Sequence, residues 1–178
     1  AAGSIILTQD ASHDIPPARG RRQLSRLLRE MLNSENGEHA AAPLSLGEAM
    51  AQLPARRKQR TRIIVISDLL GDADCATPLR ALARRHDVLI CQVLERCPAL
   101  PPIGASATLS DAKTGRTEIV PASDRWWRES AVAAHSALLA DSAARTKAAG
   151  ADYLLLPPSE DPLPALRRHF STKPQQRG

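Results

Sequence analysis

The sequence is poor in aromatic residues and has no long hydrophobic run. Only four of its 178 residues are aromatic (two Trp, one Tyr and one Phe), although hydrophobic residues make up 43%. The core must therefore be built from Leu, Ile, Val and Ala. The apolar runs, such as residues 63–66, are far shorter than the roughly 20 residues that a membrane-spanning helix needs. No segment of these residues is expected to span a membrane.

Cysteine is also scarce, and the glycine motifs of nucleotide-binding sites are absent from the sequence. Cys75, Cys91 and Cys97 form no C-x-x-C pair and have no histidine at zinc-site spacing, which favours reduced thiols in the cytoplasm over a disulfide framework or a zinc site. Neither G-x-x-x-x-G-K nor G-x-G-x-x-G occurs, so we do not expect the chain itself to hydrolyse ATP.

Positive charge is in excess, with a formal net charge of +5 and a pI near 9.6. Arg22, Arg26 and Arg29 recur at helical spacing, and a second basic run covers residues 56–62. Aromatic residues are not interleaved with these arginines, so bases would lack stacking partners. Solvated helix faces are the favoured interpretation, and a nucleic-acid-binding accessory remains an alternative.

Apolar patterns in the first half predict alternating strands and helices. Residues 3–8 indicate a buried strand, and residues 24–32 have the spacing of an amphipathic helix. A helix over residues 45–56 begins with Ser45 and Glu48, an S-x-x-E capping box. Residues 63–66 are continuously apolar, which predicts a strand covered on both faces in the middle of a parallel sheet.

The second half continues the alternation. Thr77 is expected to cap a helix that runs to about residue 85, and a strand over residues 87–94 completes a βαβ unit. The remaining elements are a hairpin (108–111 with 117–120), a helix (124–149) ended by Gly150, a strand (153–156) and a helix that opens at Asp161. This order predicts an α/β three-layer sandwich with a mostly parallel sheet and one antiparallel hairpin, in a single domain over residues 1–172 with a polar tail at 173–178.

Candidate site residues follow the apolar strand at 63–66. Ligands of open parallel sheets bind beyond the carboxyl ends of the strands, where Ser67, Asp68 and Asp72 are expected. Asp68 would hold a divalent cation or orient a base, or it would simply cap the next turn. Trp127 starts the long helix and either anchors it on the sheet or offers an exposed contact for a partner.

Five segments resemble a known bacterial family: "PPARGRRQLSRLLREML", "RTRIIVISDLLGD", "LRALARRHDVLICQVLE", "LPPIGASATLSDAKTGRTEIV" and "DYLLLPPSEDPLPALRRHF". Their order is similar to that in the von Willebrand factor A-like domain of unknown function, family 58, which is usually encoded beside a MoxR-type AAA ATPase. The resemblance implies a Rossmann-like von Willebrand A fold and a protein-interaction module that cooperates with that ATPase in complex assembly or maturation. It implies no enzyme activity and no small-molecule substrate.

Many members of this family hold a divalent cation in a metal-ion-dependent adhesion site. The resemblance places Asp68 on the aspartate of its third loop, but Leu44 falls on its threonine, and neighbouring Ser45 would substitute only by giving up its capping role. A degenerate site with no cofactor, or weak Mg²⁺ binding at most, is therefore expected. A hydrolase that uses the same sheet edge remains an alternative, although the sequence around Ser67 lacks the G-x-S-x-G motif.

The stretch Asp10-Ala-Ser12-His-Asp14 looks like the metal loop of that family. The helix that follows it, however, matches the segment after the second strand of the family, so the first strand would precede this chain. We therefore favour a polar turn at residues 10–14. The expected location is cytoplasmic, with a membrane involved only through a part N-terminal to Ala1.

Overall fold

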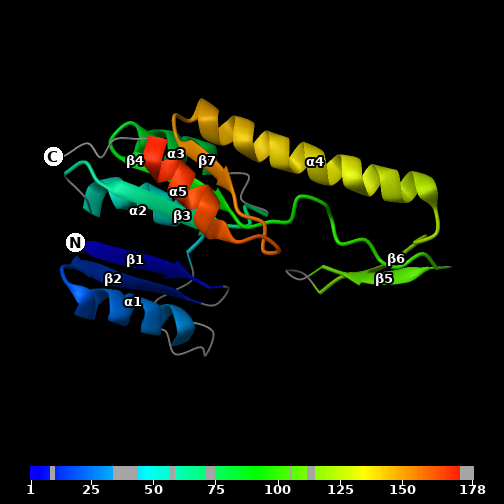
Figure 1. Ribbon diagram of the computed structural model, residues 1–178, viewed down its shortest axis with the longest axis horizontal. Coiled ribbons are helices and arrows are strands. Elements are labelled where there is room, and N and C mark those ends of the chain that lie inside the picture. Colours follow the sequence, from blue (N-terminus) through cyan, green and yellow to red (C-terminus); the bar gives the residue numbers. More distant parts are fainter. Residues whose placement is uncertain are drawn as a thin grey trace. The chain divides into compact units, whose positions relative to one another are not determined.

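A computed structural model describes residues 1–8, 11–33, 44–56, 59–70, 75–104, 106–111 and 115–172, without the side chains of residues 54–56. The chain divides into two compact units. One unit comprises Ala1–Arg62 and Gly71–Asp87, and the other comprises Ile63–Leu70 and Val88–Gly178. The elements form a mixed α/β structure with a three-stranded parallel sheet and two antiparallel strand pairs (Figure 1).

The first unit begins with an antiparallel pair, β1 (Ala2–Leu7) and β2 (Ser12–Ala18). The strand predicted at residues 3–8 is therefore present, but it is half-exposed rather than buried. The polar-turn interpretation of residues 10–14 is wrong for the last three, because Ser12 and the two residues after it are paired within β2. The turn itself is closed by the backbone N–H of Thr8, which donates to the carbonyl of Ala11 at 2.9 Å. Asp10 lies outside the described residues.

Helix α1 (Arg21–Asn33) packs against β1 and β2 with an unexpected face. Its buried residues are Gln23 and Leu27, and the Gln23 amide donates to the carbonyls of Ala2 and Pro16 at 3.0 Å each. The predicted amphipathic helix is confirmed, but most of its apolar stripe lies on the surface, since Leu28 is 63% exposed. Packing on a two-stranded ribbon covers only a narrow part of a helix.

Two further helices, α2 (Leu46–Arg56) and α3 (Ala76–Ala83), pack on each other. The predicted capping box of α2 is confirmed: the Glu48 carboxylate accepts from the backbone N–H and the hydroxyl of Ser45, both at 2.8 Å. These bonds lower the pKa of Glu48. The predicted Thr77 cap is wrong, because α3 begins two residues earlier than predicted, with Cys75 at the N-cap position.

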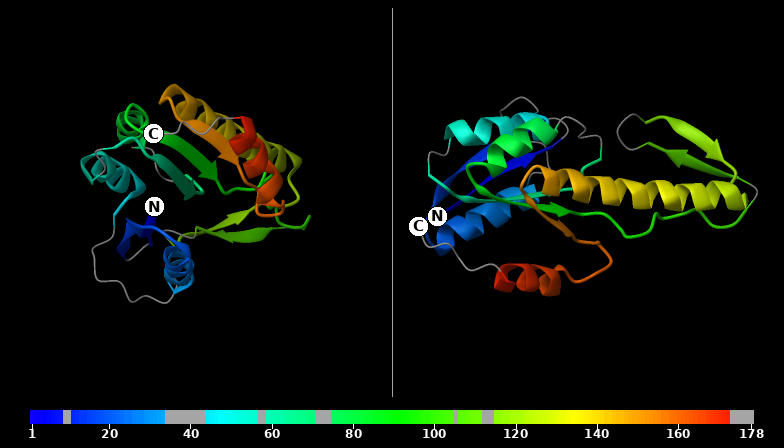
Figure 2. Two further views of the ribbon diagram at one scale, coloured as in Figure 1. Left: turned by 60° about the vertical axis from the view of Figure 1, so that its left-hand side comes forward. Right: turned by 90° about the horizontal axis from the view of Figure 1, so that it is seen from above.

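The parallel sheet has the strand order β3-β4-β7, with β3 at Arg62–Ser67, β4 at Asp87–Gln92 and β7 at Asp152–Leu155. β4 is the central strand, as Figures 1 and 2 show, and its residues 88–92 are all buried. The prediction that residues 63–66 run through the middle of the sheet is wrong. Among the described strands, β3 lies at the edge of the sheet, and Ile64 and Ile66 are 47% and 68% exposed.

The remaining elements follow the predicted order closely. The hairpin of β5 (Ala107–Ser110) and β6 (Thr117–Val120) leads into α4 (Arg125–Ala148), which packs on β7. Asp124 caps α4 through Oδ1, which accepts from the N–H of Trp126 at 2.7 Å. Gly150 follows α4 with a φ of 85°, as a C-terminal glycine should. The last helix, α5 (Pro162–Thr172), starts one residue after Asp161, and the tail at 173–178 lies outside the described residues.

His86, at the turn between α3 and β4, gives the first testable prediction. It is 3% exposed and neither ring nitrogen has a hydrogen-bond partner among the described residues. Burial, assisted by the charges of Arg85 and Arg60, lowers the pKa of His86 below its ordinary value of 6.5. His86 therefore binds a proton more readily in the unfolded chain than in the folded chain. As a result, the free energy of unfolding falls as the pH drops below 6.5.

Urea unfolding from neutral to mildly acidic pH tests this. His86→Leu removes the titrating group, so its free energy of unfolding should fall less steeply than that of the wild type over this interval. Parallel pH profiles for the two proteins would contradict the assignment.

Candidate functional site

The turn after β3 presents Asp68 at the carboxyl edge of the parallel sheet. Its carboxylate is exposed, and Oδ1 accepts from the backbone N–H of Leu70 at 3.0 Å. The hydroxyl of Ser67 accepts from the N–H of Leu69 at 3.1 Å. Leu69 has a φ of 59°, a left-handed conformation that a bulky residue adopts only where surrounding contacts impose it. Asp68 thus caps the turn and still directs a carboxylate oxygen toward solvent.

A hydrogen-bond chain across the three strands holds this turn in place. Gln92, at the end of β4, is fully buried, and its amide donates to the carbonyl of Asp68 at 2.8 Å. Its Oε1 accepts from the hydroxyl of Tyr153 on β7 at 2.7 Å. Burial raises the pKa of the Tyr153 phenol, so that it stays protonated and donates at neutral pH. The chain therefore links the end of β3 to β7 through one buried amide.

A second group of contacts fixes the loops after β4 and β7. The Glu95 carboxylate accepts from the backbone N–H of Ser159 at 2.8 Å and from its hydroxyl at 2.6 Å. The Glu95 carbonyl lies 2.7 Å from Nε2 of His135, on α4. These three residues were not predicted. Extending the carboxyl-edge rule from β3 to β4 and β7 would have found Glu95 and Ser159.

An open cleft of about 750 Å³ lies between β7 and α5, lined by residues that include Leu154, Pro157, Ala165 and His169. Arg96 and Glu160 stand on its rim and form a bidentate pair, with Nε 2.6 Å from Oε1. This pair raises the pKa of Arg96 and lowers that of Glu160. The cleft is mainly apolar, and two of its charged residues, Arg96 and Glu160, pair with each other.

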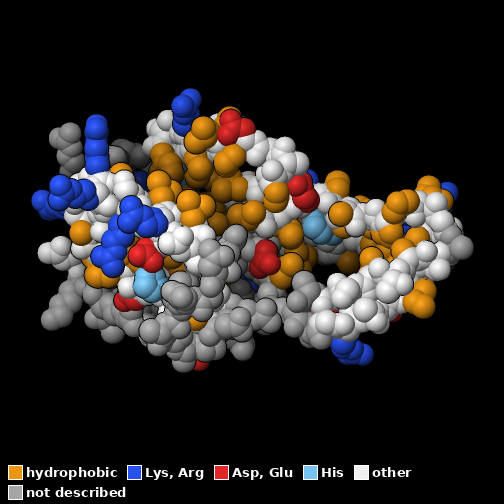
Figure 3. Space-filling model, turned by 90° about the horizontal axis from the view of Figure 1, so that it is seen from below, with side chains coloured by type: hydrophobic (Ala, Val, Ile, Leu, Met, Phe, Trp, Pro, Cys, Tyr) orange, Lys and Arg blue, Asp and Glu red, His pale blue; other side chains and the backbone are white. Residues whose placement is uncertain are grey.

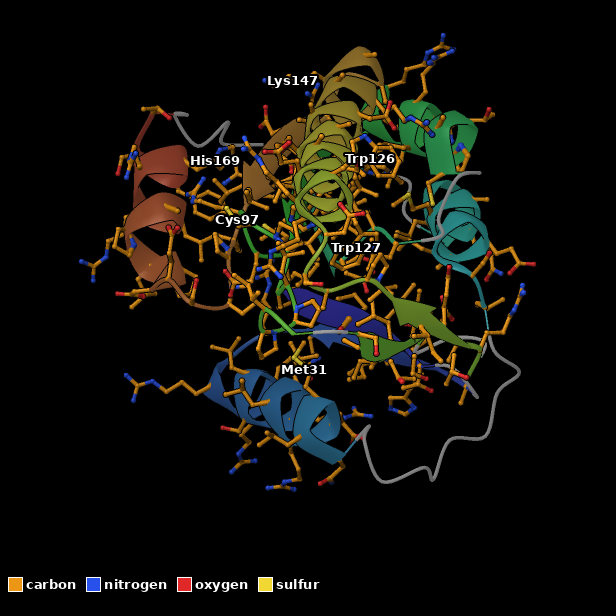
Figure 4. All side chains as sticks on the ribbon, turned by 90° about the vertical axis from the view of Figure 1, so that its right-hand side faces the viewer. Met31, Cys97, Trp126, Trp127, Lys147 and His169 are labelled. Carbon is orange, nitrogen blue, oxygen red and sulfur yellow. The ribbon has the colours of Figure 1, made fainter. Side chains whose placement is uncertain are left out.

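The residues predicted for the site are only partly brought together. Ser67 and Asp68 lie together on the carboxyl edge, whereas Asp72 lies outside the described residues. Ser45 belongs to the other compact unit and is engaged in its capping box. Trp127 is half-buried at the start of α4, and its neighbour Trp126 is 74% exposed (Figure 4).

The described part of the chain contains no cluster of three or more His, Cys, Asp or Glu side chains suited to a metal ion. The expectation of weak metal binding rests on two oxygen-bearing residues, Asp68 and Ser45. Asp68 accepts a hydrogen bond from its own turn, and the Ser45 hydroxyl donates to Glu48 in the capping box.

The arginines of α1 are exposed, as the solvated-face interpretation expects. In the space-filling view, Lys and Arg side chains stand singly or in small groups, with hydrophobic side chains between them, and form no continuous band (Figure 3). Within the described residues, no helix is both long and apolar enough to cross a membrane.

Comparison with known proteins gives the family. Residues 1–139 match the family described as "Protein of unknown function DUF58", which covers more than half of the chain. The chain belongs to this DUF58 family.

Its curated relatives are mycobacterial and uncharacterised. The chain is 30% identical over 175 residues to "Uncharacterized protein Rv1480" of Mycobacterium tuberculosis, an alignment that covers 96% of this chain and 53% of the relative. It is 34% identical over 152 residues to "Uncharacterized protein MAV169" of Mycobacterium avium, covering 83% of this chain and 86% of that protein. The chain thus spans about half the length of Rv1480.

One solved structure is similar in fold, with a TM-score of 0.53, 16% identity, and coverage of 96% of this chain and 79% of the other. It is the crystal structure of an aerotolerance-related membrane protein from Bacteroides fragilis. At this identity the similarity is one of fold alone.

Gln92 offers a direct test of the edge geometry. Gln92→Met keeps the side-chain length but leaves the Asp68 carbonyl and the Tyr153 hydroxyl without their partner, so it should lower the free energy of unfolding by about 2 kcal/mol. Tyr153→Phe is the matched control: it removes only the outer bond and should cost about 1 kcal/mol. Amide exchange at Leu69 and Leu70 should accelerate in Gln92→Met more than in Tyr153→Phe. Equal exchange in both variants would contradict a chain that runs through Gln92.

Proposed function

We propose that the chain is a protein-recognition domain of von Willebrand A type that binds a partner at the carboxyl edge of its parallel sheet. The observation that carries the proposal is the turn at residues 67–70. It presents an exposed carboxylate on a strained loop that two side-chain caps and a buried glutamine hold in one conformation. Strain maintained in this way is typical of functional loops.

The surroundings of Asp68 suit a protein partner better than a small substrate. Ile66 and Leu70 on either side are 68% and 41% exposed, so an acidic group stands within an apolar surface. Protein interfaces combine apolar contacts with a few charged groups that set orientation and specificity. Within this turn, the Ser67 hydroxyl accepts from the backbone N–H of Leu69, and no hydrogen bond from it to a base is present among the described residues.

The partner that we propose is a MoxR-type AAA ATPase, acting in the cytoplasm in the assembly or maturation of a protein complex. The support is the resemblance of the sequence to von Willebrand A-like proteins encoded beside such ATPases, together with membership of the DUF58 family. A basic Lys or Arg on the partner is the group that would match Asp68.

Binding of the purified ATPase to the immobilised chain tests this proposal. Asp68→Lys should weaken binding at least about tenfold, because it replaces a contact charge at the centre of the proposed interface with a repulsive one. Glu118→Lys, on the exposed strand β6, makes the same charge change away from this edge and should leave binding unchanged. Failure of the wild type to bind, or equal loss in both variants, would reject this partner and this edge.

Recognition at Asp68 is proposed to be independent of a tightly bound metal. Isothermal titration of Mg²⁺ into the chain alone should give binding no tighter than millimolar, because Ser45 is held in its capping box and Leu44 offers no side-chain oxygen, which leaves Asp68 as the single ligand of that set. Micromolar Mg²⁺ binding that disappears in Asp68→Ala would contradict this prediction.

A further inference from the structure

The cleft between β7 and α5 has the size of a small-molecule site. Its volume is about 750 Å³, and sites for small ligands span roughly 300–1,000 Å³. The lining residues come from β7, from the loop that follows it and from α5, together with Arg96 from the loop after β4. All of them belong to the same compact unit. The walls of the cleft are therefore built by one unit alone.

The walls of the cleft are mainly hydrocarbon. Leu154 lies on β7, Leu156 and Pro157 follow it, and Ala165 lies on α5. None of the eleven residues of α5, all of which the structure describes, is buried. The helix therefore does not close the space above β7. Apolar walls of this kind are covered favourably by an apolar molecule, because covering them removes hydrocarbon surface from water.

Polar contacts at both ends hold the two walls apart. At the start of α5, the hydrogen bonds between residues 95–96 and residues 159–160 fix the loop that joins β7 to the helix. Toward the other end, Nε2 of His169 lies 3.6 Å from Oδ2 of Asp152 on β7, and Figure 4 shows His169 on the side of α5 that faces the sheet. The cleft is thus formed before a ligand binds, which lowers the ordering cost of binding.

The charges of the cleft are arranged so that one end favours an anion. Arg96 and Glu160 neutralise each other, and Asp161 caps α5 by accepting from the N–H of Leu163 at 3.0 Å. Arg168 also lines the cleft, and no ion pair of its guanidinium is present among the described residues. Seven residues of helix place it about 10 Å from Asp161 along the axis. A guanidinium without a carboxylate partner is well suited to bind one.

We propose that this cleft binds a small apolar molecule with one anionic group, such as a carboxylate on a hydrocarbon chain. The anionic group binds Arg168, and the chain lies along Leu154, Pro157 and Ala165. The proposal goes beyond the recognition function proposed above and does not depend on it, because the turn at residues 67–70 contributes no residue to the cleft.

Isothermal titration of the whole chain with decanoate and with decanol tests the proposal. Decanoate should bind with a Kd below about 1 mM. Decanol has the same hydrocarbon chain without the charge, so it should bind about tenfold more weakly, because it loses a charge-assisted hydrogen bond to Arg168.

Two pairs of variants locate the ligand. Arg168→Gln should weaken decanoate about tenfold and leave decanol unchanged. Arg167→Gln is its matched control, since Arg167 is an exposed arginine of the same helix that does not line the cleft. Ala165→Trp fills the cleft with an indole and should abolish binding of both ligands. Ala140→Trp, at an exposed position on α4, should leave both affinities unchanged.

Three results would overturn the proposal: no binding of decanoate to the wild-type chain, equal effects of the Arg167 and Arg168 variants, or binding that survives Ala165→Trp. Another segment of the chain that occupies the cleft would give the first of these results. If Ala165→Trp does not fold, as judged by thermal unfolding, the two arginine variants still decide the question, because both replace exposed side chains. Because these experiments need no ATPase, their failure is distinguishable from failure of the proposed function.

Discussion

The carboxyl edge of the sheet depends on one buried side chain, that of Gln92. A fully buried amide must find partners for both its donor and its acceptor, and Gln92 finds them in the turn after β3 and on β7. The Asp68 carbonyl and the Tyr153 hydroxyl thereby become parts of one network. Removing the amide would leave two polar groups unsatisfied, so the network constrains the sheet edge more strongly than each bond would alone.

The strain at Leu69 follows from that constraint. A leucine with a φ of 59° is unfavourable in an isolated turn, and it persists because Ser67, Asp68 and Gln92 together fix the backbone on both sides of it. The position of the Asp68 carboxylate is therefore already fixed in the free chain. Preorganisation of this kind reduces the ordering cost of binding, which is why a rigid rim suits recognition.

Much of the element order could be predicted from the sequence, whereas the environment of each element could not. The capping box at Ser45 and Glu48, the glycine after α4 and the hairpin at 107–120 rest on local chemistry, and local chemistry was enough to find them. The position of β3 depends on which strands pair, and a continuous apolar run is the same for a central and an edge strand. Burial of Gln23 in place of Leu24 depends on long-range contacts with Ala2 and Pro16.

The candidate site shows the same division. Asp68 was located by the rule that ligands bind at the carboxyl ends of parallel strands. Gln92 could not be predicted, because a glutamine at the end of a strand gives no sequence signal of its hydrogen-bond partners. The most direct measurement of the central claim is amide hydrogen exchange at Leu69 and Leu70 in the wild-type chain. We predict protection on the order of a hundredfold or more over an unstructured loop, as expected for turns tied into a core. Exchange at the rate of an unstructured peptide would contradict a rigid turn at the proposed recognition edge.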